Sequence, residues 1–445
     1  MSDAIAAPPL ATPGRFATTR KVLTVLGMLL LLTVPQWMIG DLIEEREGRR
    51  AAVQAEIARG WAGPQTVFGP ALVIPWRAPV QRDANGAMTT QRGSVAVLPS
   101  SLRASADLAP ETRRRGLFEA TVYLARLGLA GSFALPEVSV PGVPEAELLW
   151  SEAYLIAGSN ELRPAGMAPL LTFDGRGILP GEIEPDIGLC GPQEALRWPL
   201  GLDGPPEPGR PLAFDLRLEL RGSTGFGVVP VARRSTIAIA GAWPTPSFRG
   251  AELPARSSVE EAGFEAEWST GLRVPVVRRN LGACRNDAGL MAQAVGVDLP
   301  EAVPTYRMVS RASKYTLFFL ALTFVTCAIF ELTARVRLHA VQYGLLGASV
   351  VLFPLLLLAI GEPLGFTAAY ALAAAMVVLQ ASIYTAVVTR PTLGLVLAGV
   401  LAALFGFLHV VLSLEAYALL VGTLALFTAL SVVMAVTRKV RWHAG

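Results

Sequence analysis

Apolar residues are distributed very unevenly along this chain. One apolar span lies near residues 22–39, nothing comparable follows for a long stretch, and five more spans lie between residues 315 and 437. A helix needs about 20 residues to cross the roughly 30 Å hydrocarbon core of a membrane. The pattern therefore predicts an α-helical membrane protein with one N-terminal and five C-terminal transmembrane helices. The predicted spans are residues 22–39, 315–334, 341–360, 365–388, 393–412 and 416–436.

The long segment between the first two spans changes character at Trp61. Residues 40–60 are typical of a juxtamembrane helix, with Glu45 four residues before Arg49 and Gly60 at the end. From Trp61 onward, Gly and Pro recur every few residues, which marks turns between short extended segments. Residues 214–220 and 235–240 alternate apolar and polar side chains with period two, as a half-buried strand does.

This alternation favours a large β-rich domain over residues 61–313, built as an antiparallel, sandwich-like structure. A Pro- and Gly-rich stretch near residues 180–212 is a possible boundary between two subdomains. Further predicted strands lie at residues 72–76, 94–98, 117–127 and 147–157.

Basic residues predict the orientation in the membrane, because those close to a span are retained in the cytoplasm. With the N-terminus inside, every basic residue flanking the inner ends of the spans falls on the cytoplasmic side. They are Arg15, Arg20, Lys21, Arg335, Arg337, Arg390, Arg438, Lys439 and Arg441. Residues 1–21 are then a disordered cytoplasmic N-terminus, 437–445 a cytoplasmic tail, and 40–313 periplasmic. Residues 35–41 offer no small-x-small signal-peptide cleavage site, which favours an uncleaved anchor.

Charge excludes one class of partner. The chain is only 16% charged, and its net charge of +3 comes from the inner loops. The segment 41–313 holds 28 Arg against 31 Asp and Glu, so it is slightly acidic. Neither the sign of this charge nor the compartment fits a nucleic-acid partner. The lipid bilayer is the expected partner, with an envelope component or a membrane protein as a possible second one and the oligomeric state open.

The predicted exterior segment contains no His and no Lys. Catalytic systems built on a Ser-His or Cys-His pair, on a nucleophilic lysine or on a histidine-ligated zinc are therefore excluded there. Carboxylate pairs remain, and a glycosidase needs two of them about 5 to 10 Å apart. The clustered examples are Glu182, Glu184, Asp186, Glu260 and Glu261, which are more simply interpreted as solvated charges. We predict no catalytic residue, cofactor or metal site.

The cysteines leave two alternatives open. Cys190 and Cys284 lie in the predicted exterior segment, and Cys327 lies inside the second span. An oxidising compartment permits a Cys190–Cys284 disulfide, and two free thiols are equally compatible with the sequence.

One concentrated group of polar side chains lies at the predicted cytoplasmic end of the second and third spans. Glu331 and Arg335 are four residues apart, so they share a helical face and can neutralise each other. The group is interpreted as an ion-paired anchor, with a binding or coupling site for an inner partner or lipid head group as the alternative. Its members are Glu331, Arg335, Arg337, His339, Gln342 and Tyr343.

Three features within the spans also predict local structure. Pro354 is expected to kink its helix. Gly394 and Ala398, four residues apart, are expected to let helices approach closely, and His409 to hydrogen-bond to a neighbouring helix.

Several stretches then carry a family resemblance. YRMVSRASKYTLFFLALTFVTCAIFELTARVRLHAVQYGLLG at 306–347, WAGPQTVFGPALVIP at 61–75, GSTGFGVVPVARRSTIAIAGAWPTPSFRGAELP at 222–254 and GFEAEW at 263–268 resemble the CreD family of bacterial inner-membrane proteins. These proteins are often called cell envelope integrity proteins. The resemblance covers nearly the whole chain. It departs at AVGVDLPEAVPTY, before the second span, where the family more usually has phenylalanine and Pro-Val-Asp.

The resemblance implies a physiological role: envelope stress, a Cre-type sensor and response-regulator pair, and altered sensitivity to colicins or β-lactams. It implies no catalytic residue. We therefore expect a non-enzymatic inner-membrane protein that supports envelope integrity or the envelope-stress response, with the exterior domain as a binding module and the bundle as anchor or relay. The alternatives are a transporter or channel and an exterior carboxylate-dependent hydrolase.

Overall fold

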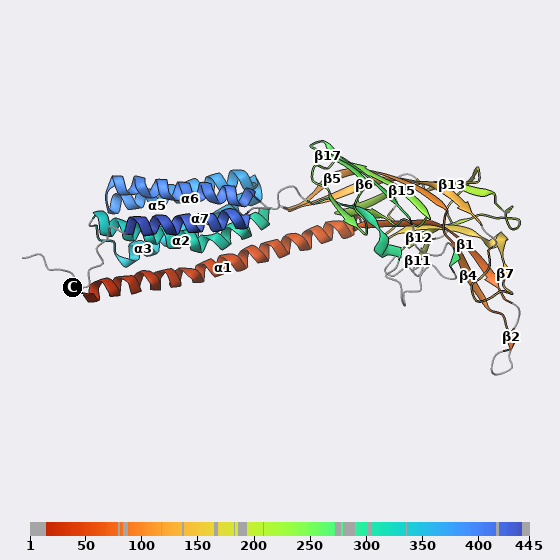
Figure 1. Cartoon of the computed structure of the whole chain (residues 1–445), viewed down its shortest axis with the longest axis horizontal. Helices are drawn as coiled ribbons and strands as arrows, with labels where there is room; N and C mark the ends of the chain where they lie inside the picture. The colour runs from red at the N-terminus through yellow and green to blue at the C-terminus, as the bar shows by residue number, and fades with distance from the viewer. Residues whose placement is uncertain are drawn as a thin grey trace, which may run out of the picture. The chain divides into compact units, whose positions relative to one another are not determined.

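The computed structural model places most of the chain in two compact units (Figure 1). Residues 1–50 and 303–445 form the helical unit, and residues 51–302 form the β unit. The described residues are all except 1–14, 79–80, 83–87, 117, 136–137, 164–167, 182, 186–193, 208, 272–276, 279–289, 301–304, 335, 415–417 and 438–445.

Seven α-helices are found among the described residues, and six of them lie wholly in the helical unit. They are α1 (Arg15–Trp61), α2 (Thr305–Ala334), α3 (Ala340–Val351), α4 (Phe353–Leu364), α5 (Phe366–Val388), α6 (Pro391–Ser413) and α7 (Ala418–Thr437). The boundary between the two units falls inside α1, after Arg50.

Five helical stretches of the described chain are long and apolar enough to cross a membrane, and they confirm the multi-span prediction. They are Leu23–Trp61, Tyr306–Glu331, Ala340–Leu364, Phe366–Val388 and Pro391–Ser413. The sixth predicted span corresponds to α7, whose described apolar stretch Leu420–Val432 is shorter than a full crossing. The structure therefore supports five of the six predicted spans.

Pro354 breaks the third predicted span into two helices. It occupies the first turn of α4, directly after α3 ends at Val351. Proline has no backbone N–H and its ring crowds the preceding turn, so the hydrogen-bond ladder is interrupted at this point. Leu352 bridges the break with a helical φ of −71°, so the two helices together still form one apolar stretch.

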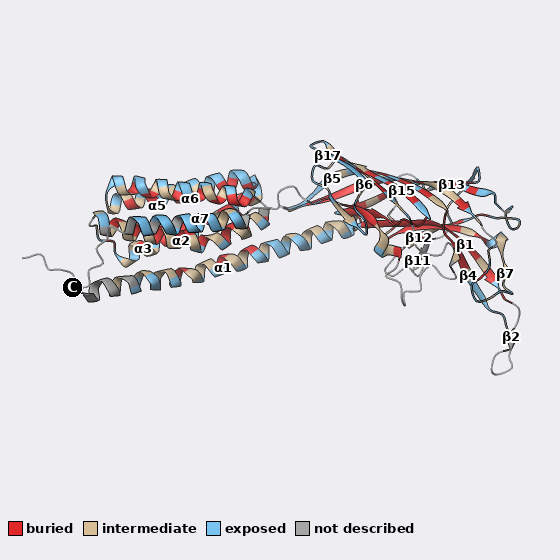
Figure 2. Ribbon diagram, in the orientation of Figure 1, coloured by how far each residue is buried: buried red, intermediate tan, exposed pale blue. Residues whose placement is uncertain are grey.

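The β unit contains two large sheets. The eight-stranded sheet has the order β10 (Arg176–Ile178), β9 (Leu170–Phe173), β13 (Pro211–Ser223), β6 (Phe118–Ala134), β5 (Ser101–Arg115), β15 (Arg234–Gly241), β18 (Gly263–Thr270), β17 (Arg256–Glu260). Its strands follow the period-two pattern of the sequence, and Figure 2 shows buried and exposed positions alternating along them.

The second large sheet has ten strands. Its main path is β11 (Ile183–Pro185), β12 (Glu194–Pro199), β8 (Tyr154–Ser159), β1 (Gln65–Arg77), β14 (Gly225–Val228), β20 (Val295–Asp298), β16 (Ser247–Gly250). Joined to this path are β4 (Arg92–Val97) and β7 (Glu147–Leu148), which pair with β1, and β19 (Val277–Arg278), which pairs with β4. A separate two-stranded sheet is made by β2 (Gln81–Arg82) and β3 (Met88–Thr89), and 3-10 turns lie at Trp150–Glu152 and Leu290–Gln293.

Both large sheets are mixed, which corrects the prediction of a purely antiparallel structure. β5 runs parallel to β15 from Ser101 with Arg234 to Leu108 with Gly241, and the first three residues of β1 run parallel to the last three of β14. Parallel neighbours require a long connection, and residues 116–233 separate β5 from β15 in the sequence. Period-two patterning predicts that a segment is a strand, but not its neighbour or its direction.

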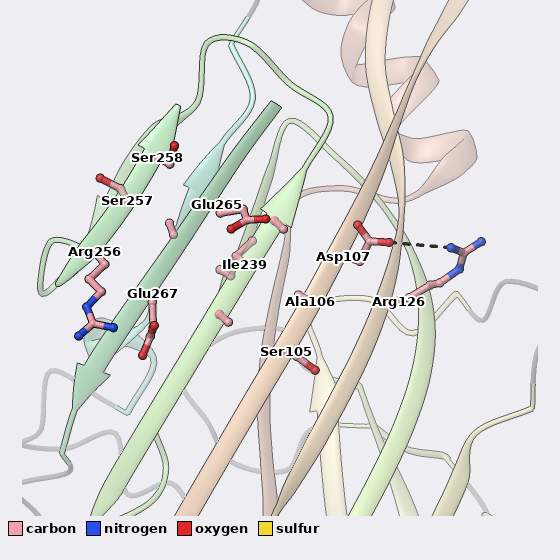
Figure 3. Close-up of a pocket in the computed structure, with 13 residues that line it drawn as sticks. Ser105, Ala106, Asp107, Arg126, Ile239, Arg256, Ser257, Ser258, Glu265 and Glu267 are labelled. Carbon is pink, nitrogen blue, oxygen red and sulfur yellow. Dashed lines mark ion pairs between the residues drawn. The ribbon is translucent and has the colours of Figure 1, made fainter. Parts of the chain in front are cut away.

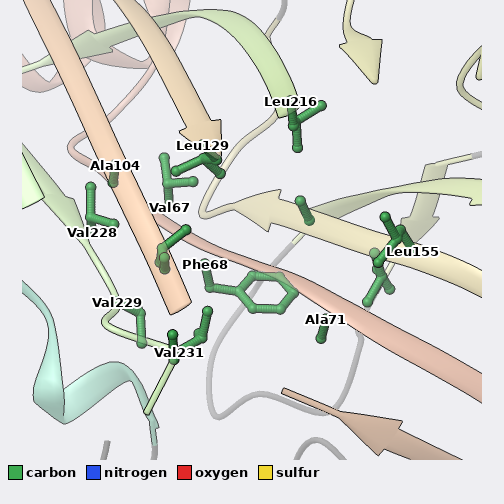
Figure 4. Close-up of a cluster of buried hydrophobic side chains, with 14 of the residues drawn as sticks. Val67, Phe68, Ala71, Ala104, Leu129, Leu155, Leu216, Val228, Val229 and Val231 are labelled. Carbon is green, nitrogen blue, oxygen red and sulfur yellow. The ribbon is translucent and has the colours of Figure 1, made fainter. Parts of the chain in front are cut away.

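Side chains from both large sheets meet in one hydrophobic core (Figure 4). Phe68 and Leu155 come from the ten-stranded sheet, and Leu129 and Leu216 from the eight-stranded one. All four are at most 1% exposed. The core includes residues on both sides of 180–212, where the sequence suggested a possible subdomain boundary.

A tight hairpin joins β9 to β10. Asp174 and Gly175 both have positive φ, 46° and 80°, as a two-residue type I′ turn requires. Asp174 also accepts a hydrogen bond from Arg210 (2.7 Å), so its carboxylate has a structural partner. Asp-Gly is a dipeptide typical of such a turn.

An exposed pair in the β unit predicts a small pH dependence of stability. Arg77 donates to Glu147 through Nε (2.7 Å) and Nη2 (3.0 Å), and these bonds and the positive charge lower the pKa of Glu147. A carboxylate with a lower pKa in the folded than in the unfolded protein stabilises the fold at pH values above its unfolded pKa. This stabilisation is lost as the pH falls through its folded pKa. We expect Arg77→Gln to lower the unfolding midpoint at pH 7, with the difference from wild type vanishing in acid. Arg92→Gln, on the neighbouring strand, is the control and should show no such convergence.

Candidate functional site

Glu331 is the electrostatic centre of the predicted polar group. It lies in the last turns of α2, and Lys21 Nζ on α1 donates to its Oε1 at 2.5 Å. The backbone N–H of Leu338 donates to the same oxygen at 2.6 Å. Glu331 thus links α1, α2 and the turn before α3. The expected partner, Arg335, lies outside the described residues, and Lys21 was not among the predicted members.

His339 and Gln342 act together as the N-terminal cap of α3. The Val341 N–H donates to His339 Nδ1 (3.3 Å), and the His339 N–H donates to Gln342 Oε1 (2.8 Å). This reciprocal arrangement satisfies backbone donors that the first turn of a helix leaves unpaired. These two side chains therefore have a structural function in starting the helix.

The other two described members of the group differ in burial. Tyr343 is 2% exposed and packs edge-on against Phe324, with ring centroids 5.4 Å apart. Arg337 is exposed. The structure therefore brings Glu331, His339, Gln342 and Tyr343 to one turn, and Arg337 is an exposed side chain beside them.

A second polar group, absent from the sequence predictions, joins α1, where it leaves the helical unit, to the start of α2 and the end of α4. Tyr306 donates through its hydroxyl to Glu362 Oε1 at 3.0 Å, and Arg46 Nη1 lies 3.8 Å from the same oxygen. The guanidinium of Arg50 lies over the Tyr306 ring, 5.5 Å from its centroid. No local spacing in the sequence connects Glu362 to α1.

Between these two groups, α1 makes a third polar contact with α2. Gln36 Nε2 donates to the Ser313 carbonyl oxygen (2.9 Å) and to its Oγ (2.8 Å). Ser313 is buried, so this bond fixes the depth of α1 against α2 where water is scarce. Within the helical unit, α1 is therefore held near its start, its middle and its end.

The last turns of α1 belong to the β unit and are held there by a different set of contacts. Trp61 donates through Nε1 to the Tyr123 carbonyl oxygen (3.2 Å), and the guanidinium groups of Arg113 and Arg221 lie 4.6 and 4.7 Å from its ring centroid. Arg115 forms an ion pair of 2.7 Å with Glu56. The contacts of Trp61 hold the last residue of α1 against the β unit, and the ion pair of Glu56 holds the preceding turn.

Polar residues within the spans are used mainly for packing. Tyr370 on α5 donates to the Phe405 carbonyl oxygen on α6 at 2.5 Å, and its ring centroid lies 5.0 Å from that of His409. His409 Nδ1 makes no hydrogen bond with any described residue, contrary to the expectation for this side chain. A Cβ on Gly394 would lie 2.5 Å from Ala386 Cβ, so Gly394 does permit close approach of α5 and α6.

Several predicted features fall outside the described residues. Cys190 and Cys284 are both among them, so their pairing stays a prediction, while Cys327 is a buried free thiol. Glu182 and Asp186 also fall there. Glu260 and Glu261 are exposed at the β17–β18 turn. Across the part of the chain that the structure describes, no three His, Cys, Asp or Glu side chains are grouped as a metal site requires.

Comparison with known proteins identifies the family. The family described as "Inner membrane protein CreD" matches residues 17–443. The inner membrane protein CreD of Escherichia coli (strain K12) is 31% identical over 436 residues, which cover 95% of this chain and 93% of that protein. A match of this length includes α1, the β unit and the C-terminal helices together. With several apolar helices able to cross a membrane, this multi-pass chain belongs to the CreD family of inner membrane proteins.

Proposed function

We propose that this protein supports cell envelope integrity or the envelope-stress response without catalysing a reaction. In this proposal the N- and C-termini are cytoplasmic and the β unit is periplasmic, as the basic residues flanking the spans indicate. The β unit binds an envelope component, and the helical unit anchors it and relays its state. The absence of His and Lys from residues 41–313 supports binding over catalysis.

The observation that carries this proposal is the continuity of α1. It is one helix of 47 residues, with its residues up to Arg50 in the helical unit and its last turns in the β unit. Lys21, Gln36 and Arg46 hold it within the helical unit, and Glu56 and Trp61 hold it within the β unit. A hydrogen-bonded helix transmits a displacement or rotation along its axis, whereas a flexible linker does not.

A proline in α1 tests the relay. Ala52 is exposed, so replacing it removes no buried contact, but a proline there eliminates one helical hydrogen bond and costs about 3 kcal/mol of local helix stability. In cells that lack their own copy, we expect Ala52→Pro to reach the membrane at the wild-type level and to lose β-lactam and detergent tolerance.

Ala52→Leu is the matched control, because leucine keeps the helix intact at the same exposed position. Limited proteolysis of both variants checks that each unit stays folded. Full tolerance in cells that produce Ala52→Pro would overturn the relay, since the units would then function without a continuous helix.

A further inference from the structure

The solvent face of the eight-stranded sheet contains an open groove (Figure 3). It has a volume of about 660 Å³ and lies over β5, β6, β15, β18 and β17. A second hollow of about 540 Å³ continues it, because Asp107, Ala240, Ser258 and Glu265 line both. Together they form one trough, called here the sheet groove, which lies wholly within the β unit.

Small side chains form the floor of the sheet groove. Ser105, Ala238 and Ala240 point to the solvent face, opposite Ala104, Ala106 and the other core residues of the same strands. A solvent face of a sheet is usually covered by long polar side chains. Here the short side chains leave the sheet backbone accessible, so another chain can approach closely.

The walls of the sheet groove carry more acid than base. Asp107 is already partnered by Arg126, with 3.8 Å between their charged atoms. Glu265 and Glu267 on β18 have no ion pair with any described residue. Across both hollows the acidic residues Asp107, Glu260, Glu265 and Glu267 outnumber the basic residues Arg126 and Arg256.

The spacing of the Glu265 and Glu267 carboxylates matches that of alternate side chains in an extended chain. Glu265 and Glu267 are two residues apart on one strand, so they project from the same face about 7 Å apart. Alternate side chains of a bound extended peptide have the same spacing. Basic residues at alternate positions of such a peptide would therefore meet both carboxylates in register.

We propose that the sheet groove binds an extended, cationic polypeptide segment with basic residues at alternate positions. This inference rests on the proposed function, because it names the site and the chemical class of the partner that the β unit binds. Electrostatic complementarity brings the segment to the acidic wall, and the small floor lets its backbone lie close to the sheet.

The sheet groove is better suited to binding than to hydrolysis. Its acidic side chains stand on an open surface, with the Asp107 side chain 65% exposed and held by an ion pair. Carboxylates that act as acid and nucleophile on a glycoside need a desolvated cleft around the scissile bond. An exposed, charge-paired wall instead provides reversible contacts with a flexible partner.

The binding test uses full-length protein in nanodiscs of zwitterionic lipid, so that a cationic probe has no anionic membrane to bind. The probe is a fluorescein-labelled nine-residue peptide of alternating arginine and serine, measured by fluorescence anisotropy. Two comparison peptides have the same residues with the arginines in one block, or glutamate in place of each arginine. We expect the alternating peptide to bind several-fold more tightly than the block peptide, and the glutamate peptide not to bind.

Two double variants locate the site. Glu265→Gln combined with Glu267→Gln should lower the affinity for the alternating peptide by roughly five- to thirtyfold, as expected for the loss of two partly exposed ion pairs. Asp203→Asn with Glu207→Gln changes the protein charge equally on the loop before β13 and should leave binding unchanged. Ala238→Trp keeps every charge and fills the floor, so it should weaken binding as well. Unfolding midpoints of all variants confirm that they are folded.

Three results would each overturn the sheet groove as a cationic peptide site. They are equal affinity for the alternating and block peptides, unchanged binding to the Glu265→Gln, Glu267→Gln variant, and tighter binding of the glutamate peptide or of neutral dextran. The proposed function fails by a different measurement, since Ala52→Pro leaves the sheet groove intact. If Ala52→Pro loses tolerance and the wild-type protein binds none of the peptides, the relay is supported and the cationic partner is rejected.

Discussion

Replacing Gly222 by alanine is expected to cost about 3 kcal/mol or more of the stability of the β unit. A Cβ at Gly222 would lie 2.6 Å from Cε2 of the Tyr123 ring and still closer to Cζ. Tyr123 is fully buried, and its hydroxyl donates to the Gly225 carbonyl oxygen at 2.7 Å, so the ring has no free space to enter. Overpacking a rigid core site costs 1–3 kcal/mol, and loss of the buried hydrogen bond adds about 1 kcal/mol.

A double variant separates the steric cause from any other. Truncating the ring with Tyr123→Leu removes the obstacle, so adding Gly222→Ala to that background should cost much less than it does in wild type. Gly296→Ala is the contrasting case, because its Cβ would lie 2.6 Å from the Gly227 Cα, and no side-chain truncation can relieve a backbone obstacle. Gly177→Ala, with open space around its Cβ, should be nearly neutral. Thermal unfolding followed by tryptophan fluorescence measures all five variants, and additive costs for Gly222→Ala and Tyr123→Leu would contradict the steric account.

The crowding around Gly222 explains part of residues 222–254, one of the stretches that resemble the CreD family. Within residues 222–254, Thr224 has a left-handed φ of 58°, and a Cβ at Gly225 would collide with the Asp298 carboxylate. The small residues at the start of this stretch allow β14 to lie between β1 and β20 and beneath Tyr123. Packing of these small residues therefore explains the start of the stretch.

The sequence predicts elements well where a single physical demand dominates. In a bilayer each helix must be long and apolar, so hydropathy alone identifies the five confirmed spans, and Pro354 identifies the break between α3 and α4. Period-two alternation likewise identifies β13 and β15. Strand neighbours are a different matter, because the parallel pairing of β5 with β15 depends on long-range packing that no local pattern records.

The same limit applies to the candidate site. The sequence identifies Glu331, His339 and Gln342 because they are close together along the chain. It misses Lys21, which is 310 residues from Glu331, and the group around Glu362. Spacing rules on a helix reach only three or four residues, so they suggest Arg335 as a partner and cannot suggest a residue on another helix. The basic residue immediately before the first apolar span was the available signal, since a lysine at that depth needs an acceptor.

Removing the Glu331 carboxylate is the second large effect expected. Glu331 is 12% exposed and accepts from both Lys21 and Leu338, so Glu331→Leu leaves a buried N–H unpaired and the ammonium without its partner. We expect a loss of about 2–4 kcal/mol. Glu331→Gln keeps an oxygen for Leu338 and should cost about 1–2 kcal/mol. Lys21→Met should cost less than about 1 kcal/mol, because Lys21 is 41% exposed and solvent screens its charge.

A double-mutant cycle tests whether these two residues act on each other. The Lys21→Met, Glu331→Gln double variant should cost less than the sum of the single variants, with a coupling of about 0.5–1 kcal/mol. Glu45→Gln is the matched control: its partner Arg49 is four residues away, both side chains are about 60% exposed, and the expected cost is below about 0.5 kcal/mol. Thermal unfolding of the detergent-solubilised protein gives these values. Zero coupling between Lys21 and Glu331 would mean that the ion pair does not hold α1 against α2.

Comparing an Arg337 variant with the Glu331 variants distinguishes an anchoring role of this polar group from a binding role. It is exposed, so Arg337→Gln should leave stability and membrane level unchanged, whereas the Glu331 variants should lower both. If envelope-stress tolerance follows protein level across the whole set, the polar group is an anchor that sets the depth of α1. If Arg337→Gln alone lowers tolerance at a normal protein level, the exposed guanidinium contacts a partner or a lipid phosphate, and the anchor formed by Glu331 and Lys21 serves to present it.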